Sequence, residues 1–352
     1  MKSAKLPFIV QALLAAIFFG ASAPLSKLLL GDVPPVLMAA FLYLGSGTGI
    51  TLMKALQKQK AETSLSRADL PWLAGAIIAG GVAAPIVLMF SLKNTPASTA
   101  SLLLNFEGVG TTLIALLAFK EAIGGRAWGA ILAITLASIA LSTDFTKGVA
   151  GWGFSPGALG VIGACMLWGL DNNFTRNISD KDPLAIVAWK GLLAGAFSLL
   201  LGWLLGNQFP SWLTIVVIML MGFVCYGLST MLFIQSMRGL GAARTSALYG
   251  TAPLAGVILS IFMFGEIPSV LFGVAALLAI GGALLLINEK HTHFHDHAPL
   301  VHDHRHDHSD PAHAHPHETD IGAHAERHEH PAEAHEHDHS PDIHHRHGHD
   351  QS

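Results

Sequence analysis

Apolar stretches alternate with short polar segments along residues 1–290 of the chain. Each stretch is roughly 20 residues long, the length that an α-helix needs to cross the hydrocarbon core of a bilayer. Pro24, Pro85 and Pro253 interrupt the first, third and ninth stretches. The pattern therefore predicts an all-α polytopic membrane protein with ten transmembrane helices, which we expect at residues 8–29, 35–56, 71–91, 97–118, 126–143, 157–175, 184–206, 211–235, 243–264 and 269–288.

The pattern of the first half recurs in the second half. Residues 91–121 and 236–266 each contain a polar turn, an apolar run and a glutamate, and six positions are identical at a constant offset of 145. These positions are Ser91, Ala97, Ser101, Leu103, Phe119 and Glu121, which recur as Ser236, Ala242, Ser246, Leu248, Phe264 and Glu266. Near the start of each half, Gly20, Lys27 and Pro34 recur as Gly169, Arg176 and Pro183. We therefore expect a duplicated five-helix membrane unit, with residues 1–145 as the first repeat and 146–290 as the second.

Composition separates this membrane body from residues 291–352. Of the whole chain 51% is hydrophobic and 12% is charged, whereas soluble domains carry roughly a quarter charged residues. All 21 histidines lie in residues 291–349, and residues 291–352 carry a formal charge of −10 against +6 for residues 1–290. We expect this acidic segment to be a disordered, His-rich tail. The two cysteines lie in apolar stretches and form neither a metal-binding spacing nor a disulfide framework.

The distribution of basic residues predicts the orientation of the chain in the membrane. With the N-terminus inside the cell, 13 Lys and Arg residues flank the inner ends of the predicted helices and three flank the outer ends. Because cytoplasmic loops carry the excess of positive charge, we expect a multi-pass protein of the cytoplasmic membrane with both termini in the cytoplasm. Five helices per repeat place the second copy upside down relative to the first, which makes the two units inverted repeats.

These features resemble the drug/metabolite transporter superfamily, specifically its EamA-type members. The resemblance covers residues 8–288. It rests first on the fourth and ninth predicted helices, which run through small-residue midpoints to Glu121 and Glu266. It rests also on two sequences, AAIFFGASAPLSKLLLGDVPP in the first helix and GACMLWGLDNNFTR in the sixth. It implies a ten-helix secondary transporter. Members of the superfamily move solutes as different as amino acids, metabolites, drugs and sugar conjugates, and the histidine tail is no part of their general pattern.

Ionisable side chains inside the predicted helices are the first candidates for a translocation site, because such groups are costly in a bilayer and are retained mainly for function. Glu107, two residues after Asn105, lies at the middle of the fourth helix, and its counterpart in the second repeat is Ala252. This unmatched carboxylate indicates a substrate or proton site; the alternative is a buried carboxyl that is neutral or hydrogen-bonded to another helix. Trp168 and Tyr249 are candidates to line the site, although packing or interfacial anchoring is the commoner role of such residues.

Three further charged residues lie within the predicted helices. Asp171, followed by Asn172 in the sixth helix, and Lys190 in the seventh lie at a similar depth. We expect a buried salt bridge between them, and a gate that opens by breaking the pair is the alternative. Lys27, near the outer end of the first helix, either contacts the substrate or extends its amine to the interface, as lysines at helix ends do.

Histidine recurs at every second residue in parts of the tail. This spacing suits an extended chain that wraps Zn²⁺, Ni²⁺, Co²⁺ or Cu²⁺ with imidazole ligands. The tail is then a metal buffer or sensor. A solvated tail without a metal role, and a pH-responsive segment whose protonation reverses its charge, are the alternatives. The candidate metal ligands are His291, His293, His295, His297, His302, His304, His306 and His308.

The sequence contains no phosphate-binding loop, nucleophile elbow or conventional catalytic dyad, so we expect a transporter rather than an enzyme. The main hypothesis is a secondary exporter of a small organic metabolite, coupled to protons through Glu107 and requiring no cofactor. The rival hypotheses are a divalent-metal carrier that uses the tail and a membrane metal sensor that does not transport. The expected partners are a small-molecule substrate, membrane lipid and divalent metal ions, but no nucleic acid; a homodimer is an open alternative.

Overall fold

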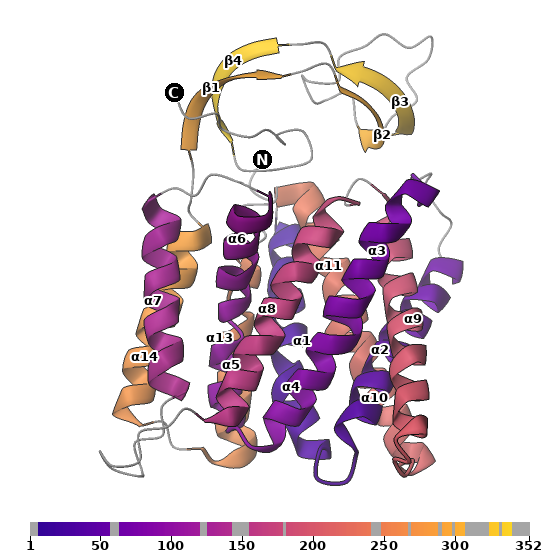
Figure 1. The fold of residues 1–352 in the computed structure, drawn as a ribbon, viewed down its shortest axis with the longest axis vertical. Coiled ribbons are helices and arrows are strands. Elements are labelled where there is room, and N and C mark those ends of the chain that lie inside the picture. Colours follow the sequence, from indigo (N-terminus) through magenta and orange to yellow (C-terminus); the bar gives the residue numbers. More distant parts are fainter. Residues whose placement is uncertain are drawn as a thin grey trace.

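The chain folds into a bundle of long helices that run up and down in alternation (Figure 1). The first part contains α1 (Leu6–Leu29), α2 (Pro35–Leu56), the 3₁₀ turn η2 (Arg67–Asp69), α3 (Leu70–Ala76), the π-helical segment η3 (Ile77–Ala83), α4 (Ala84–Lys93), α5 (Ala97–Leu103), α6 (Phe106–Phe119) and α7 (Gly125–Ser142). The second part contains α8 (Pro156–Arg176), α9 (Pro183–Leu204), α10 (Trp212–Gly222), the π-helical segment η6 (Phe223–Leu228), α11 (Ser229–Leu240), α13 (Ala252–Phe264) and α14 (Val270–Ile287). This computed structural model describes residues 6–56, 63–119, 125–142, 155–178, 181–240, 248–266, 269–287, 291–297, 300–306, 324–330 and 333–339.

The described helices are those of a multi-pass membrane protein. Six helical stretches are long and apolar enough to cross a bilayer: Leu6–Leu29, Pro35–Leu56, Arg67–Lys93, Ala97–Ala118, Pro183–Leu204 and Trp212–Ser236. Three shorter apolar helices lie at Trp128–Leu141, Ala252–Phe264 and Val270–Gly282. Large apolar side chains are exposed on the outside of the bundle, among them Val270 and Phe262 at 88% and 82% exposure. An exterior of this kind suits lipid, since contiguous apolar surface is rare on soluble monomers.

Helices of the two parts pack in corresponding pairs. The second helix of the first part, α2, packs on its counterpart α9, and α7 packs on α14. The contact of α1 with α13 has its counterpart in the contact of α8 with α6. At the crossing of α2 and α9 the backbones meet through two glycines, because a methyl group added to Gly47 would lie 2.8 Å from the carbonyl carbon of Gly191, and one added to Gly191 would lie 2.6 Å from the Gly47 Cα.

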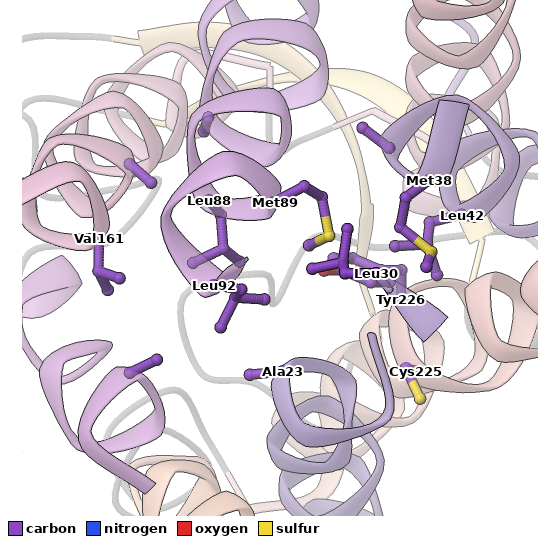
Figure 2. Packing of buried hydrophobic residues seen from close by; sticks show 14 of the residues in the cluster. Ala23, Leu30, Met38, Leu42, Leu88, Met89, Leu92, Val161, Cys225 and Tyr226 are labelled. Atoms are coloured by element: carbon purple, nitrogen blue, oxygen red, sulfur yellow. The ribbon is translucent and has the colours of Figure 1, made fainter. Parts of the chain in front are cut away.

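The hydrophobic core lies where the two parts meet. Its main cluster draws buried side chains from α1, α2, α4, α5 and η6, and also from α8 to α10. Figure 2 labels Leu30, Met38, Met89 and Tyr226 among its members, and all four residues are at most 8% exposed. Because residues from both halves of the sequence fill this one cluster, neither half buries its apolar surface without the other.

Three predicted spans differ from regular helices. The fourth span was expected to be continuous over residues 97–118, but it is broken between α5 and α6 at Leu104 and Asn105. The third and eighth spans each contain a π-helical segment, and η3 and η6 lie at nearly equivalent positions of the proposed repeat. Pro24 was expected to interrupt the first span, but α1 continues through it. Proline only removes one backbone donor and crowds the preceding turn, and neighbouring helices can compensate this loss in a membrane protein.

The tail differs from the expectation of a segment without secondary structure. Strands β1 (His291–His297) and β4 (Glu333–His339) pair antiparallel, and so do β2 (Leu300–His306) and β3 (His324–His330). Figure 1 shows both ribbons beyond the end of the bundle at which α1 begins. The physical reason is the alternation of histidine with acidic and small residues, since a period of two residues suits an extended strand. The remaining residues of 291–352, His308 among them, lie outside the described part of the chain.

Candidate functional site

The break in the fourth span places Glu107 in the interior of the bundle. After α5 the backbone makes a turn in which the Asn105 amide donates to the Leu102 carbonyl at 3.2 Å and the Glu107 amide donates to the Leu104 carbonyl at 3.1 Å. The Asn105 side chain donates to the same Leu102 carbonyl at 3.1 Å. Glu107 therefore lies in the first turn of α6, beside an irregular backbone in the middle of a span. Broken helices of this kind are tolerated at membrane depth where the backbone is buried in protein or lines a cavity.

A hydrogen bond from α8 holds the Glu107 carboxylate. Asn172 Nδ2 donates to Glu107 Oε1 at 2.9 Å and lies 3.1 Å from the Thr111 hydroxyl oxygen. The next residue, Asn173, is buried and donates to the carbonyl oxygens of Thr111 at 3.0 Å and Gly169 at 2.8 Å. Two consecutive amides of α8 thus fix the start of α6, one at the carboxylate and one at the backbone.

Asp171 and Lys190 form the ion pair that the sequence predicts. The Lys190 amine donates to Asp171 Oδ2, and the Thr175 hydroxyl donates to Asp171 Oδ1 at 3.0 Å. The Asp171 side chain is 4% exposed and the Lys190 side chain 20% exposed. A buried carboxylate needs such partners, because an unpaired charge in this setting would be strongly destabilising.

The π-helical segment η3 supplies a carbonyl group to the same region. The Gly80 carbonyl oxygen accepts two side-chain hydrogen bonds, from the Tyr43 hydroxyl at 2.7 Å and from Trp168 Nε1 at 3.0 Å. A side chain at Gly80 would collide with the Asp171 carboxylate, so glycine is required for the close approach of η3 to α8. π-helical segments within α-helices are frequently found at functional sites.

A row of aromatic rings continues from Tyr43 toward the ninth span. The ring centroids of Tyr43 and Tyr226 are 5.5 Å apart, and those of Tyr226 and Phe19 are 6.1 Å apart. Phe19 lies 5.6 Å from Tyr249, and Tyr249 lies 4.7 Å from Phe233. Tyr249 directly precedes the turn before α13, at a position close to the repeat equivalent of the break before α6.

Lys27 lies away from this cluster. Its amine donates to the carbonyl oxygen of Leu92 at 2.9 Å and also to that of Thr95 at the C-terminal end of α4, which is the opposite end of the bundle from the N-terminus. Nearby, the two carboxylate oxygens of Glu266 accept from the amides of Ala97 and Ser98, each at 2.9 Å. Both side chains therefore satisfy backbone groups at helix ends, an arrangement that differs from both roles weighed for Lys27 in the sequence.

The structure thus brings together most of the predicted residues, namely Glu107, Asn105, Asp171, Asn172, Lys190 and Trp168. Tyr249 is connected to them through the row of rings that starts at Tyr43. The structure adds Thr111 and the Gly80 carbonyl, neither of which sequence reasoning picks out. The sequence feature that could have pointed to Gly80 is the pair of adjacent glycines, Gly80 and Gly81, inside an apolar stretch. A glycine in such a position often has a packing or functional reason.

The candidate metal ligands of the tail are placed only by their backbone. The register pairs His291 with His339, His293 with His337 and His295 with His335 in one ribbon, and His302 with His328 and His306 with His324 in the other. In the same ribbons His297 is opposite Glu333 and His304 is opposite Glu326. Within the helical body, the described residues contain no group of three or more His, Cys, Asp or Glu side chains that could hold a metal ion.

Comparison with known proteins gives a family match and similarities to individual proteins. The family described as "EamA-like transporter family" matches residues 6–143 and again residues 155–288. A protein of Methanothermobacter thermautotrophicus named "Uncharacterized transporter" is 26% identical over 293 residues, which are 79% of this chain and 85% of that protein. A protein with a solved crystal structure superposes with a TM-score of 0.55 and 20% sequence identity, covering 80% of this chain and 95% of its own. At this identity the structural likeness concerns the fold alone.

Proposed function

Because the chain belongs to the EamA-like transporter family, we propose that it is a secondary carrier that moves a small organic metabolite across the cytoplasmic membrane by alternating access. The observation that carries the proposal is the position of Glu107. This carboxylate lies beside a broken helix inside the bundle, and the equivalent position of the second half is the buried Ala252. A polar group that does not follow the repeat is better explained by a ligand than by folding, since the second half folds without it.

Two inverted five-helix repeats are the architecture that we propose for the carrier. The paired packing of α2 with α9 and of α7 with α14 supports this arrangement, as do the equivalent π-helical segments η3 and η6. The family also matches the chain twice, over residues 6–143 and 155–288. In this architecture ten spans result when the polar helix α8 and the three shorter apolar helices are counted with the six longer ones. A site between inverted repeats opens alternately to the two sides as one repeat rocks against the other.

Proton coupling follows from the same carboxylate. If Glu107 holds either a proton or the solute, the inward proton gradient drives the solute outward, and export is the direction that we propose. The orientation with both termini in the cytoplasm rests on the excess of Lys and Arg at one set of helix ends. The His-rich tail then lies in the cytoplasm, where we propose that it binds late first-row divalent metal ions without forming part of the translocation site.

The test is a thermal-unfolding screen on the purified protein, both full-length and truncated after Lys290. The panel contains amino acids, nucleosides, polyamines, sugar phosphates and divalent metal ions, because a bound ligand raises the melting temperature by mass action. We expect an organic solute to stabilise both forms, which would locate its site in the helices. Stabilisation of the truncated form by metals instead would favour the divalent-metal carrier, and a metal effect confined to the full-length protein would report only the tail.

A further inference from the structure

The charges of the central cluster do not balance. Glu107 and Asp171 are acidic and Lys190 is basic, and the ion pair joins Lys190 to Asp171. Glu107 receives a hydrogen bond from the Asn172 amide at 2.9 Å. Within the described part of the chain, no Lys or Arg forms an ion pair with Glu107. With all three groups ionised, the cluster therefore carries one net negative charge, and this charge lies on Glu107.

The groups that face Glu107 from neighbouring elements do not neutralise it. The amine of Lys190, on α9, is paired with Asp171 and forms no ion pair with Glu107. The Cys165 thiol of α8 lies 3.6 Å from the Leu103 carbonyl and 3.9 Å from that of Leu104, next to the break. From α7, residues 128–142 contribute no ionisable side chain. The balancing charge must then be a proton or a ligand.

A row of aromatic rings begins beside the Asp171–Lys190 pair, next to the unbalanced carboxylate. The Tyr43 hydroxyl donates to the Gly80 carbonyl, which also accepts from Trp168 of α8, and Gly80 lies against the Asp171 carboxylate. The other two of the three tyrosines in the chain are Tyr226 and Tyr249. They belong to the continuous row of five rings that runs from Tyr43 to Phe233. The faces of such rings are electron-rich, and they attract a cation that lies within about 6 Å of the ring centroid.

The combination of these features selects one class of solute. An anion would meet the negative charge of Glu107, and a late divalent metal ion would find no group of three His, Cys, Asp or Glu side chains among the described residues of the bundle. Building on the proposed function, we propose that the solute is a monovalent organic cation whose charged nitrogen pairs with Glu107 and whose apolar part lies against the tyrosine rings. The cation and a proton then compete for one carboxylate, so each bound cation releases at most one proton.

The proposal is tested with benzyltrimethylammonium, a permanent cation, and neopentylbenzene, in which carbon replaces its charged nitrogen. Each is titrated into the full-length protein in detergent, at neutral and at mildly acidic pH, and binding is followed by tryptophan fluorescence and by proton release in weak buffer. We expect the cation to bind at least about tenfold more tightly than its uncharged analogue. Its affinity should fall by about tenfold per pH unit once the pH is below the pKa of the carboxyl group, because only the ionised form binds it.

Three variants complete the experiment. Glu107→Gln should lose at least about tenfold in affinity and all proton release, whereas Glu107→Asp, which keeps the charge, should retain proton release. Asp69→Asn makes the same chemical change at the turn η2, where Asp69 accepts from Ser66 at 2.7 Å, and should leave binding unchanged. If Glu107→Gln does not fold, the pH dependence of benzyltrimethylammonium binding to the wild-type protein tests the proposal in its place.

The outcomes separate this proposal from the proposed function. Equal binding of the analogue, pH-independent binding, or no binding of benzyltrimethylammonium overturns the assignment of a cation. If a neutral or anionic solute from the screening panel then stabilised the truncated protein, the proposed carrier function would still be supported. A truncated protein that no organic solute stabilises would overturn the proposed function itself.

Discussion

Gly169 of α8 faces the backbone of Thr111 in α6 so closely that a methyl group added to Gly169 would lie 2.6 Å from the Thr111 amide nitrogen. In the other half Gly20 of α1 crosses α13 in a similar way, one turn earlier along the helix, where the added methyl group would lie 3.0 Å from the Ala252 carbonyl carbon. Since the obstacle is backbone in both cases, neither helix can yield by rotating a side chain. These two crossings set the positions of Glu107 and of its counterpart, Ala252, relative to the rest of the bundle.

We therefore predict that Gly169→Ala destabilises the protein by about 1–3 kcal/mol, the usual cost of overpacking a well-packed contact. The measurement is the melting temperature in detergent, together with binding of the solute found in the screen. Gly163→Ala is the matched control, because it lies in the same helix and nothing lies within 4 Å of its added methyl group. That variant should be neutral or more stable by up to about 1 kcal/mol, since alanine favours helix over glycine. Equal effects of the two substitutions would contradict the close contact.

The two described ion pairs should differ in their contribution to stability. Lys190→Met leaves the Asp171 carboxylate, 4% exposed, without its cation and should cost about 3 kcal/mol, as breaking a buried pair does. Lys54→Met breaks the pair with Asp182, which is formed at 2.5 Å between side chains that are 26% and 14% exposed, and should cost about 1 kcal/mol or less. Thermal unfolding of both variants gives the comparison.

A double variant checks the cause of this difference. Lys190→Met combined with Asp171→Asn removes both charges and should recover much of the stability that Lys190→Met loses, because the penalty comes from the unpaired carboxylate and not from the missing attraction. A double variant less stable than Lys190→Met would instead show that hydrogen bonds of Asp171, such as that from Thr175, matter more than its charge.

Much of the helical order could be predicted from the length of the apolar runs, because the bilayer fixes the length of a spanning helix and favours apolar side chains along it. The observed bounds of α1 and α2, Leu6–Leu29 and Pro35–Leu56, lie close to the expected 8–29 and 35–56. The pairing of Asp171 with Lys190 could also be predicted, because two opposite charges at one depth of the membrane stabilise each other when they pair.

The irregular features could not be predicted in the same way. The break before Glu107 falls at Asn105, and asparagine is a weak helix former. Asn172 and Asn173, however, lie inside the continuous helix α8, so an asparagine in an apolar run does not by itself predict a break. The carbonyl of Gly80 becomes an acceptor for Tyr43 and Trp168 only because η3, α2 and α8 converge, which is a property of the packing. Lys27 has the sequence context of a residue that extends to the interface, whereas its partners are backbone carbonyls that only the fold brings near.

Glu266 should stabilise the start of α5 as a cap supplied by a distant part of the chain. It accepts from the amides of Ala97 and Ser98, and these are two of the four donors that the first turn of a helix leaves unpaired. We predict that Glu266→Ala lowers the stability by about 1–2 kcal/mol, in the range of lost helix caps. The rate of amide hydrogen exchange should rise selectively in Ala97–Leu103. Glu266→Gln keeps one acceptor oxygen, so its stability should lie between those of the wild type and Glu266→Ala. An unchanged exchange rate in α5 would rule out the cap.

Paired strands of the tail predict which histidines bind a metal ion together. In an antiparallel ribbon, directly opposed residues lie on the same face with Cβ atoms about 5 Å apart, close enough for two imidazoles to reach one ion. His293 and His337 are such a pair, as are the neighbouring positions Thr292 and Asp338.

Replacing both histidines, His293 and His337, by alanine should weaken Ni²⁺ or Zn²⁺ binding to the full-length protein by at least about tenfold, since each lost ligand removes part of a chelate. The control replaces Thr292 and Asp338 instead and should bind as the wild type does. Isothermal titration measures both, and an equal loss in the two variants, or unchanged binding after the histidine replacement, would show that the register of β1 and β4 does not determine the metal site.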